Sequence, residues 1–176
     1  MDDQNHIVGV IDKVAEARFF LCKLEASTDF AECAYYASAF GSACYSIVEC
    51  LKRRSRDPKD ACDWWRSVFD GLKASPMHRY FHDGRNDDIH EGNNLVSGIE
   101  VKISVVDSKV VGATSPLLKA GRPYSPGKPA IECREYFISL LRVVLDGYRR
   151  FNGAWDPDRA LASEFSIYEG ELTPLH

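Results

Sequence analysis

The chain has 176 residues, of which 45% are hydrophobic and 11% aromatic, and this composition predicts one globular domain with its own core. Its formal net charge of −4 excludes a broadly basic nucleic-acid-binding protein, so any contact with phosphates must be local. The acidic start MDDQNHIVGVIDK differs from a signal peptide, and no apolar run reaches the roughly 18 residues of a membrane span. We therefore expect a cytoplasmic protein that makes no membrane contact.

Apolar residues recur at three- and four-residue steps in the first third of the chain, which predicts two amphipathic helices. The first helix covers about 7–25. The second covers about 28–53 and begins at a capping box formed by Asp29 and Glu32. Small residues fill its centre at 37–43, where another helix or a second chain would be able to approach closely.

Two shorter helices are expected next, and each starts at a proline. Asp57 is the predicted N-cap of the third helix, with Pro58 at its first position. Ser75 and Pro76 play the same parts at the start of the fourth helix, which continues to about residue 92.

After Gly92 the apolar period changes to two, because Ile99, Val101, Ile103 and Val105 alternate with polar residues. This pattern predicts a β-hairpin near 98–112, and the segment rich in Pro and Gly that follows predicts a long exposed loop up to about residue 129. A last helix is expected over 130–151, ending at Asn152-Gly153. The predicted fold is mostly α: a helical bundle in one domain, 1–176, with a small β-hairpin insertion within 95–129 and a weakly patterned tail, 154–176.

Six cysteines are present, but no CxxC pair or zinc-like Cys/His spacing is found. Cys22, Cys33, Cys44 and Cys133 fall on apolar stripes of the expected helices, where free thiols pack as small hydrophobic groups. We therefore expect buried, reduced thiols, and neither a metal nor a cofactor.

The fourth helix carries an unusual polar stretch, FHDGRNDDIHEG, at 81–92. His78, His82, Asn86 and His90 are spaced by four and form a stripe along the helix, which Arg85 flanks. These side chains titrate near neutral pH or bind phosphate, so this side of the helix is the candidate functional site.

Arg85-Asn86, three further residues and then His90 lie in a helix that follows the long helix FAECAYYASAFGSACYSIVECL. This arrangement resembles the HEPN family of helical-bundle proteins, whose hallmark is an Arg followed four to six residues later by His, with a polar residue directly after the Arg. The resemblance covers roughly 10–92 and the final long helix.

The resemblance implies a metal-independent endoribonuclease, as a toxin or a defence component, that leaves a 2′,3′-cyclic phosphate. Arg85, His90 and Asn86 would be catalytic, and His78, His82, Arg53 and Arg54 would contact the RNA. It also implies a homodimer in which two motifs share one cleft, and a cognate antitoxin or regulatory protein as partner.

Helix geometry leaves alternatives open, because five residues place Arg85 and His90 about 140° apart and about 7.5 Å along the axis. Three explanations would bring the two residues to one site. The long Arg85 side chain could extend around the helix, the helix could loosen near its end, or two chains could each contribute one motif to a shared cleft. Arg85 would otherwise be an ion-pair partner of Asp83, Asp87 or Asp88, with His90 a cation at a helix C-terminus. In that case the chain is a non-catalytic module that binds a nucleotide, RNA or a protein. Asp87 and Asp88 side chains turned to solvent would favour the enzyme, whereas the same side chains turned into the pocket would favour the non-catalytic module.

Overall fold

The computed structural model describes the chain except residues 1–4, 92–94, 107–108, 120–126 and 156–176. Five helices and two strands make up the described part, in the order α1 (Asn5–Ala26), α2 (Phe30–Arg54), α3 (Lys59–Ala74), α4 (Pro76–Glu91), β1 (Val96–Val106), β2 (Lys109–Leu118) and α5 (Pro129–Trp155). The predicted fold class is confirmed: the chain is a mostly helical bundle with a small antiparallel β insertion.

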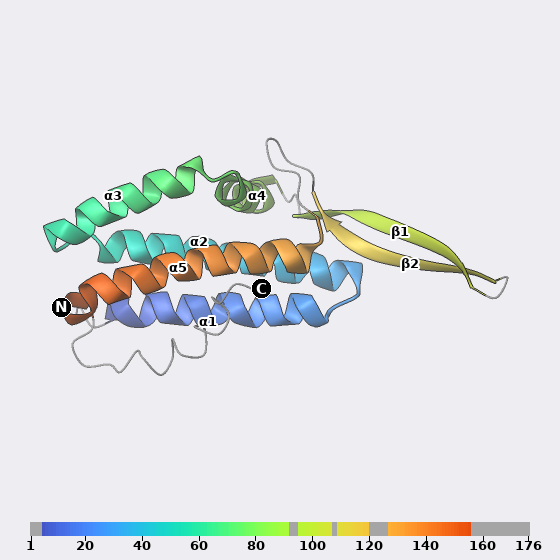
Figure 1. Ribbon diagram of the computed structural model, residues 1–176, viewed down its shortest axis with the longest axis horizontal. Coiled ribbons are helices and arrows are strands. Elements are labelled where there is room, and N and C mark those ends of the chain that lie inside the picture. Colours follow the sequence, from blue (N-terminus) through green and yellow to red (C-terminus); the bar gives the residue numbers. More distant parts are fainter. Residues whose placement is uncertain (1–4, 92–94, 107–108, 120–126, 156–176) are drawn as a thin grey trace.

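Three long helices, α1, α2 and α5, lie alongside one another, and α1 runs opposite to the other two (Figure 1). Helices α3 and α4 cover the side of this layer that faces away from α1, and the β1–β2 hairpin projects beyond one end of the bundle (Figure 1). The polar stretch of α4 therefore lies against α2 and α5, close to the point where the hairpin leaves the body.

One apolar core joins the helices, as their three- and four-residue spacing predicts. Phe40 of α2, Phe81 of α4 and Phe137 of α5 are among its largest fully buried side chains. Close packing also involves glycine: a Cβ atom added at Gly84 of α4 would lie 2.3 Å from Cδ2 of the buried Leu95. Leu95, directly before β1, thus packs against the same helix that carries the polar stripe.

Helix starts follow the predicted caps in two of three cases. The Asp29 side chain accepts a hydrogen bond from the Glu32 amide at 2.9 Å, and the Ser75 hydroxyl accepts one from the His78 amide at 3.3 Å. Asp57 was predicted to cap α3, which is wrong. The cap is Pro58, which makes no side-chain hydrogen bond, and the helix begins one residue later than expected, at Lys59.

The hairpin is longer than the sequence predicts. Its register runs from Val106 opposite Lys109 to Val96 opposite Leu118, so residues 112–118, which we expected in an exposed loop, complete the second strand. Pro116 lies opposite Ile99 and is tolerated because the strand has an outer edge that needs no amide donor. Leu118 is buried, which ties the end of this strand to the core.

Helix α5 continues past its predicted end. Phe151 has φ −122° and ψ 15°, so the chain kinks there and resumes as helix up to Trp155 instead of stopping at Asn152-Gly153. A short helix expected over 158–165, in the tail, lies outside the described residues.

The cysteines are free thiols, as predicted. Cys33, Cys44 and Cys133 are buried, but Cys22 is exposed because its neighbour Leu21 takes the inward position of α1. None of the described helices combines the length and the low polarity that crossing a membrane requires.

Candidate functional site

Phe81 fixes the orientation of α4 in the bundle. Its ring is stacked on Tyr136 of α5, with centroids 4.4 Å apart and an interplanar angle of 4°, and it meets Phe40 of α2 edge-on at 6.1 Å. Aromatic pairs of this kind have preferred geometries, so they define the helix rotation as well as its burial. With Phe81 inward, His78 and Arg85, about one turn before and one turn after it, lie close to α2.

His78 belongs to the core of the protein. It is 5% exposed, and its Nδ1 lies 2.9 Å from the hydroxyl oxygen of Tyr136 in a hydrogen bond. The pKa of His78 is lowered from 6.5 to about 4. Burial is the largest cause, the charge of His82 acts in the same direction, and the charge of Asp83 partly opposes both. Burial also raises the pKa of Tyr136 well above 10.0, so both partners are neutral near pH 7.

The enclosed and already bonded ring argues against the predicted contact between His78 and a substrate. A small cavity of about 10 Å³ lies beside it, lined by Gly41, Tyr45, Val48, His78, Phe81, His82 and Tyr136. This is about the volume that one water molecule needs, so the cavity holds no substrate.

Arg85 is held by a residue that the sequence analysis did not single out. Its guanidinium carbon lies 4.2 Å from the ring centroid of Tyr45 on α2, and its Nη1 donates a hydrogen bond to Oδ1 of Asn86 at 3.1 Å. A cation over an aromatic face is attracted by the ring, while its in-plane N–H groups stay directed outward. The Nε of Arg85 is shielded from solvent and has no hydrogen-bond acceptor in the described structure.

His82 also packs near the ring of Tyr45. Its ring centroid is 5.6 Å from that of Tyr45, and its Nδ1 lies 3.2 Å from Oδ1 of Asp83. His82 is half-buried, so one part of the ring remains accessible. Tyr45 thus brings together His82 and Arg85, two of the polar side chains predicted to form the site.

His90 and Asp87 lie on the exposed part of α4, and the helix remains regular through Glu91. The helix therefore does not loosen between Arg85 and His90, which removes one of the three explanations for their separation. Among the described side chains none forms an ion pair with Arg85; the side chain of Asp88 is outside the description. Asp87 is turned to solvent, the placement that we associated with an enzyme.

Arg53 and Arg54 end α2 at a distance from this cluster. Arg53 is eight residues beyond Tyr45, which corresponds to about 12 Å along the helix. Arg53 is exposed and Arg54 half-buried, so neither joins Tyr45, His82 and Arg85 in one site. Their place in the last turn is the favourable one for cations at a helix C-terminus.

No group of three His, Cys, Asp or Glu side chains that would hold a metal ion is found in the part of the chain that the structure describes. His78 and His82, the HxxxH pair of α4, have ring centroids 5.9 Å apart, and His78 is committed to Tyr136.

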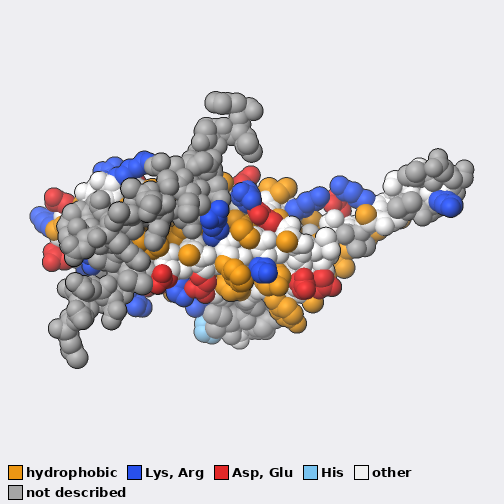
Figure 2. Space-filling model, turned by 90° about the horizontal axis from the view of Figure 1, so that it is seen from below, with side chains coloured by type: hydrophobic (Ala, Val, Ile, Leu, Met, Phe, Trp, Pro, Cys, Tyr) orange, Lys and Arg blue, Asp and Glu red, His pale blue; other side chains and the backbone are white. Residues whose placement is uncertain are grey.

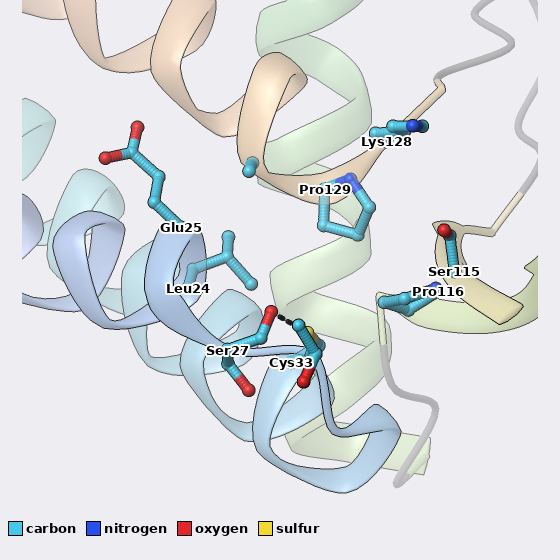
Figure 3. Close-up of a pocket in the computed structure, with 10 residues that line it drawn as sticks. Leu24, Glu25, Ser27, Cys33, Ser115, Pro116, Lys128 and Pro129 are labelled. Atoms are coloured by element: carbon cyan, nitrogen blue, oxygen red, sulfur yellow. Dashed lines mark hydrogen bonds between the residues drawn. The ribbon is translucent and has the colours of Figure 1, made fainter. Parts of the chain in front are cut away.

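A hollow of about 170 Å³ lies at the base of the hairpin, where Ser115 and Pro116 of β2 approach Leu24 of α1 and Pro129 of α5 (Figure 3). The Cys33 thiol in its wall donates a hydrogen bond to the Ser27 carbonyl at 3.6 Å. Burial raises the pKa of Cys33, so the group is a thiol and not a nucleophilic thiolate at neutral pH.

Another hollow, of about 530 Å³, is lined by residues of α3 and α5 that include Trp64, Asp146 and Arg150. The Asp146 carboxylate accepts hydrogen bonds from Trp64 Nε1 at 2.8 Å and from Arg150 Nε at 2.9 Å. Burial raises the pKa of Asp146, but these hydrogen bonds outweigh it and lower the pKa below 3.8. Trp64, Asp146 and Arg150 thus satisfy one another's hydrogen bonds in this hollow. The cluster of Tyr45, His82 and Arg85 remains the best candidate site.

Sequence reasoning missed Tyr45 and the polar contact of Tyr136. Tyr136 was assigned to an apolar face, yet a buried tyrosine hydroxyl nearly always has a partner, and that rule would have pointed to a nearby histidine. Tyr45 lies directly beside the apolar position Cys44. An aromatic residue at the border of an apolar stripe is the sequence feature that could have pointed to it.

Comparison with protein-family models, with curated proteins and with solved structures finds no match for this chain.

Proposed function

We propose that the protein is a metal-independent endoribonuclease whose site is centred on Arg85. The single observation that carries the proposal is the fixed position of this guanidinium, which Tyr45 holds from α2 and Asn86 holds on α4. A preorganised arginine suits the cleavage of a phosphodiester, because negative charge develops on the phosphate in the transition state.

The reaction is an internal transfer at phosphorus. The ribose 2′-hydroxyl loses its proton and its oxygen attacks the adjacent phosphorus, while the bond from phosphorus to the 5′-oxygen breaks and that oxygen gains a proton. The products are a 2′,3′-cyclic phosphate and a 5′-hydroxyl. His90 would transfer one of the protons, as histidine does most often in general acid–base catalysis, and Arg85 would stabilise the five-coordinate phosphate. Asn86, one turn before His90, would orient the histidine or the scissile phosphate.

A homodimer completes this proposal. On the regular helix α4 the two residues point about 140° apart, so a cleft that uses both is most simply built by two copies of the motif. Two histidines are then available, one as base and the other as acid. His82 beside Tyr45 is the further histidine that would contact the RNA, and Asp87, turned to solvent, leaves the approach of phosphate open.

The cytoplasm is the compartment that we propose, because an RNA substrate and free thiols both suit it. A toxin or defence role, with a cognate antitoxin or regulatory protein as partner, would follow from the HEPN resemblance and is part of the same proposal.

Cleavage of single-stranded RNA in EDTA tests the proposal. Arg85→Ala and His90→Ala should each abolish cleavage, and the double variant should lose little more, since groups that serve one transition state are strongly non-additive. Circular dichroism and sedimentation should be unchanged in all three variants. His82→Ala should be milder, and Arg53→Ala, on the distant end of α2, is the matched control that should cleave normally.

A non-catalytic module is the second candidate, and one observation favours it. The Arg85 guanidinium already has two partners, and His82 is close to the Asp83 carboxylate, which would repel a phosphate. Wild-type protein that leaves diverse RNAs intact but binds a nucleotide or RNA, with affinity lost in Arg85→Ala, would establish this candidate and reject the nuclease.

A further inference from the structure

The β1–β2 hairpin presents an apolar face that its own bundle does not cover. Ile99, Val101, Ile103 and Val105 lie on one face of β1 and are between 55% and 70% exposed. The hairpin extends beyond the end of the helices (Figure 1), and hydrophobic side chains lie beside Lys and Arg side chains along this arm (Figure 2). A contiguous exposed row of large β-branched residues is typical of an interaction surface.

Among the described residues, the outer edge of β1 has no strand partner. The described sheet has two strands, so the backbone N–H and C=O groups of β1 that point away from β2 have no strand neighbour there. Such an edge is a template for a further strand, and an isolated two-stranded hairpin is only marginally stable in water. An added strand would therefore both satisfy these groups and support the arm.

The sequence of β1 is complementary to itself when it pairs antiparallel. Its centre, Ile99 to Ile103, reads IEVKI, with an apolar residue at each odd position and charges of opposite sign on the two sides of Val101. We propose that β1 pairs with β1 of a second copy about a two-fold axis at Val101, which forms a four-stranded sheet.

This register matches every central side chain with a suitable partner. Val101 lies opposite its own equivalent and Ile99 opposite Ile103 on the apolar face, while Glu100 lies opposite Lys102 twice on the other face. Directly opposite residues on neighbouring strands have Cβ atoms about 5 Å apart, so both apolar and ionic pairs make contact. Pairing removes the flanks of the apolar side chains from water and leaves the front of the sheet open.

Neighbouring registers are worse. An axis at Glu100 or at Lys102 sets two like charges directly opposite each other, which destabilises a sheet. An axis at Ile103 places Lys102 opposite Ser104 and leaves both charges without an opposite partner. Charge complementarity therefore selects the axis at Val101.

The environment of Glu100 supports this choice. Its Oε2 is shielded from solvent and accepts no hydrogen bond in the described structure, although Lys102 Nζ of the same strand lies 3.7 Å away. The ion pair within the strand is longer than a hydrogen bond, and an ammonium group from the second copy would supply a donor to the half-exposed Glu100 carboxylate.

The hairpin contact goes beyond the proposed function and is independent of it. Val96 is five residues from the axis, about 17 Å at the rise of a β-strand, so the two copies of Val96 would be about 33 Å apart. The ends of the two α4 helices, just before β1, would therefore not meet in one cleft through this contact. Loss of the hairpin contact and loss of RNA cleavage are thus separate outcomes.

Cysteine cross-linking tests the register. Val101→Cys places two sulfur-bearing residues opposite each other with Cα atoms about 5 Å apart, within the range of a disulfide. Val105→Cys is the matched control, because residue 105 has similar exposure on the same face but lies about 27 Å from its equivalent. Under mild oxidation Val101→Cys should form a covalent dimer, whereas Val105→Cys and the wild type, with its exposed Cys22, should not.

Charge exchange tests the complementarity. E100K and K102E should each weaken association in sedimentation velocity roughly five- to twentyfold, because each replaces two attractive pairs by two repulsive ones. The double variant E100K/K102E exchanges the charges and should return to within about twofold of the wild type. The proposal is overturned if Val101→Cys and Val105→Cys cross-link equally, or if the single charge variants associate like the wild type. A wild-type monomer at tens of micromolar would also overturn it and would assign the apolar face to a different protein.

Discussion

The burial of His78 predicts how the free energy of unfolding depends on pH. Its pKa is about 4 in the folded protein, against 6.5 for an exposed histidine, a difference of about 2.5 pH units. Between these values the unfolded chain binds a proton at this residue and the folded chain does not, so the free energy of unfolding falls as the pH falls. At about 1.4 kcal/mol per pH unit, His78 should cost the fold about 3 kcal/mol between pH 6.5 and pH 4.

The assay is urea unfolding of the wild type and of His78→Asn at several pH values between 7 and 4. Asparagine keeps a polar atom near the position of Nδ1 for the Tyr136 hydroxyl but does not titrate, so the difference between the two curves isolates His78. The wild type should lose about 3 kcal/mol more than the variant over this range. His90→Asn, the same change at an exposed position, should follow the wild type. Parallel pH profiles for the wild type and His78→Asn would refute the assignment of a buried neutral histidine.

Further substitutions test the packing of the site and the stability of the helices around it. Tyr45→Leu should reduce RNA cleavage or binding by a factor that corresponds to about 0.5–2 kcal/mol, whereas Tyr45→Phe keeps the ring under Arg85 and should stay near the wild type; equal losses would contradict the stacking. Phe81→Ala should lower the free energy of unfolding by about 3–5 kcal/mol in chemical denaturation, because it empties a fully buried aromatic position. Asp29→Ala should cost about 1 kcal/mol in the same experiment, since it removes the cap of α2, and an unchanged midpoint would show that the cap contributes nothing.

Local patterns predicted most of the secondary structure. The three- and four-residue spacing of apolar side chains gave the positions of all five described helices, and the period of two from Ile99 to Val105 gave the first strand. Asp29 and Ser75 were identifiable as caps because capping depends on residues close in sequence. These features need no knowledge of distant contacts.

Features that depend on distant contacts were not predictable. The segment that contains Pro116 was expected to be a loop, yet pairing with β1 and burial of Leu118 extend the strand through it. Apolar periodicity placed Cys22 inward, whereas Leu21 takes that position.

The candidate site shows the same limit. The polar stripe of α4 was visible in the sequence, but the sequence did not show which of its members are buried and which are accessible. His78 is enclosed and hydrogen-bonded to Tyr136, while Arg85 is held by Tyr45. Both tyrosines come from other helices, more than 35 residues away in sequence, so no spacing within the stripe could indicate which of its members would be buried.

The small-residue stretch 37–43 was expected to allow close approach of another helix, and that stretch or the aromatic residues were expected to offer a contact surface for a second chain. Ala37, Phe40 and Ala43 are buried within their own chain, so these side chains are not available for that contact. Any pairing of two Arg85 sites must use the outer surface around α4, and the hairpin offers a second, separate surface.

The central claim is that Arg85 and His90 promote attack by a 2′-hydroxyl. The most direct measurement compares two short RNAs of one sequence in EDTA, of which one carries a single 2′-deoxy nucleotide at the cleaved position, with mass analysis of the product ends. We expect the wild type to cut the all-ribose RNA to a 2′,3′-cyclic phosphate and to leave the substituted RNA intact at that position, and we expect His90→Ala to cut neither. Cleavage of the 2′-deoxy substrate, cleavage by His90→Ala, or an uncut all-ribose RNA would contradict it.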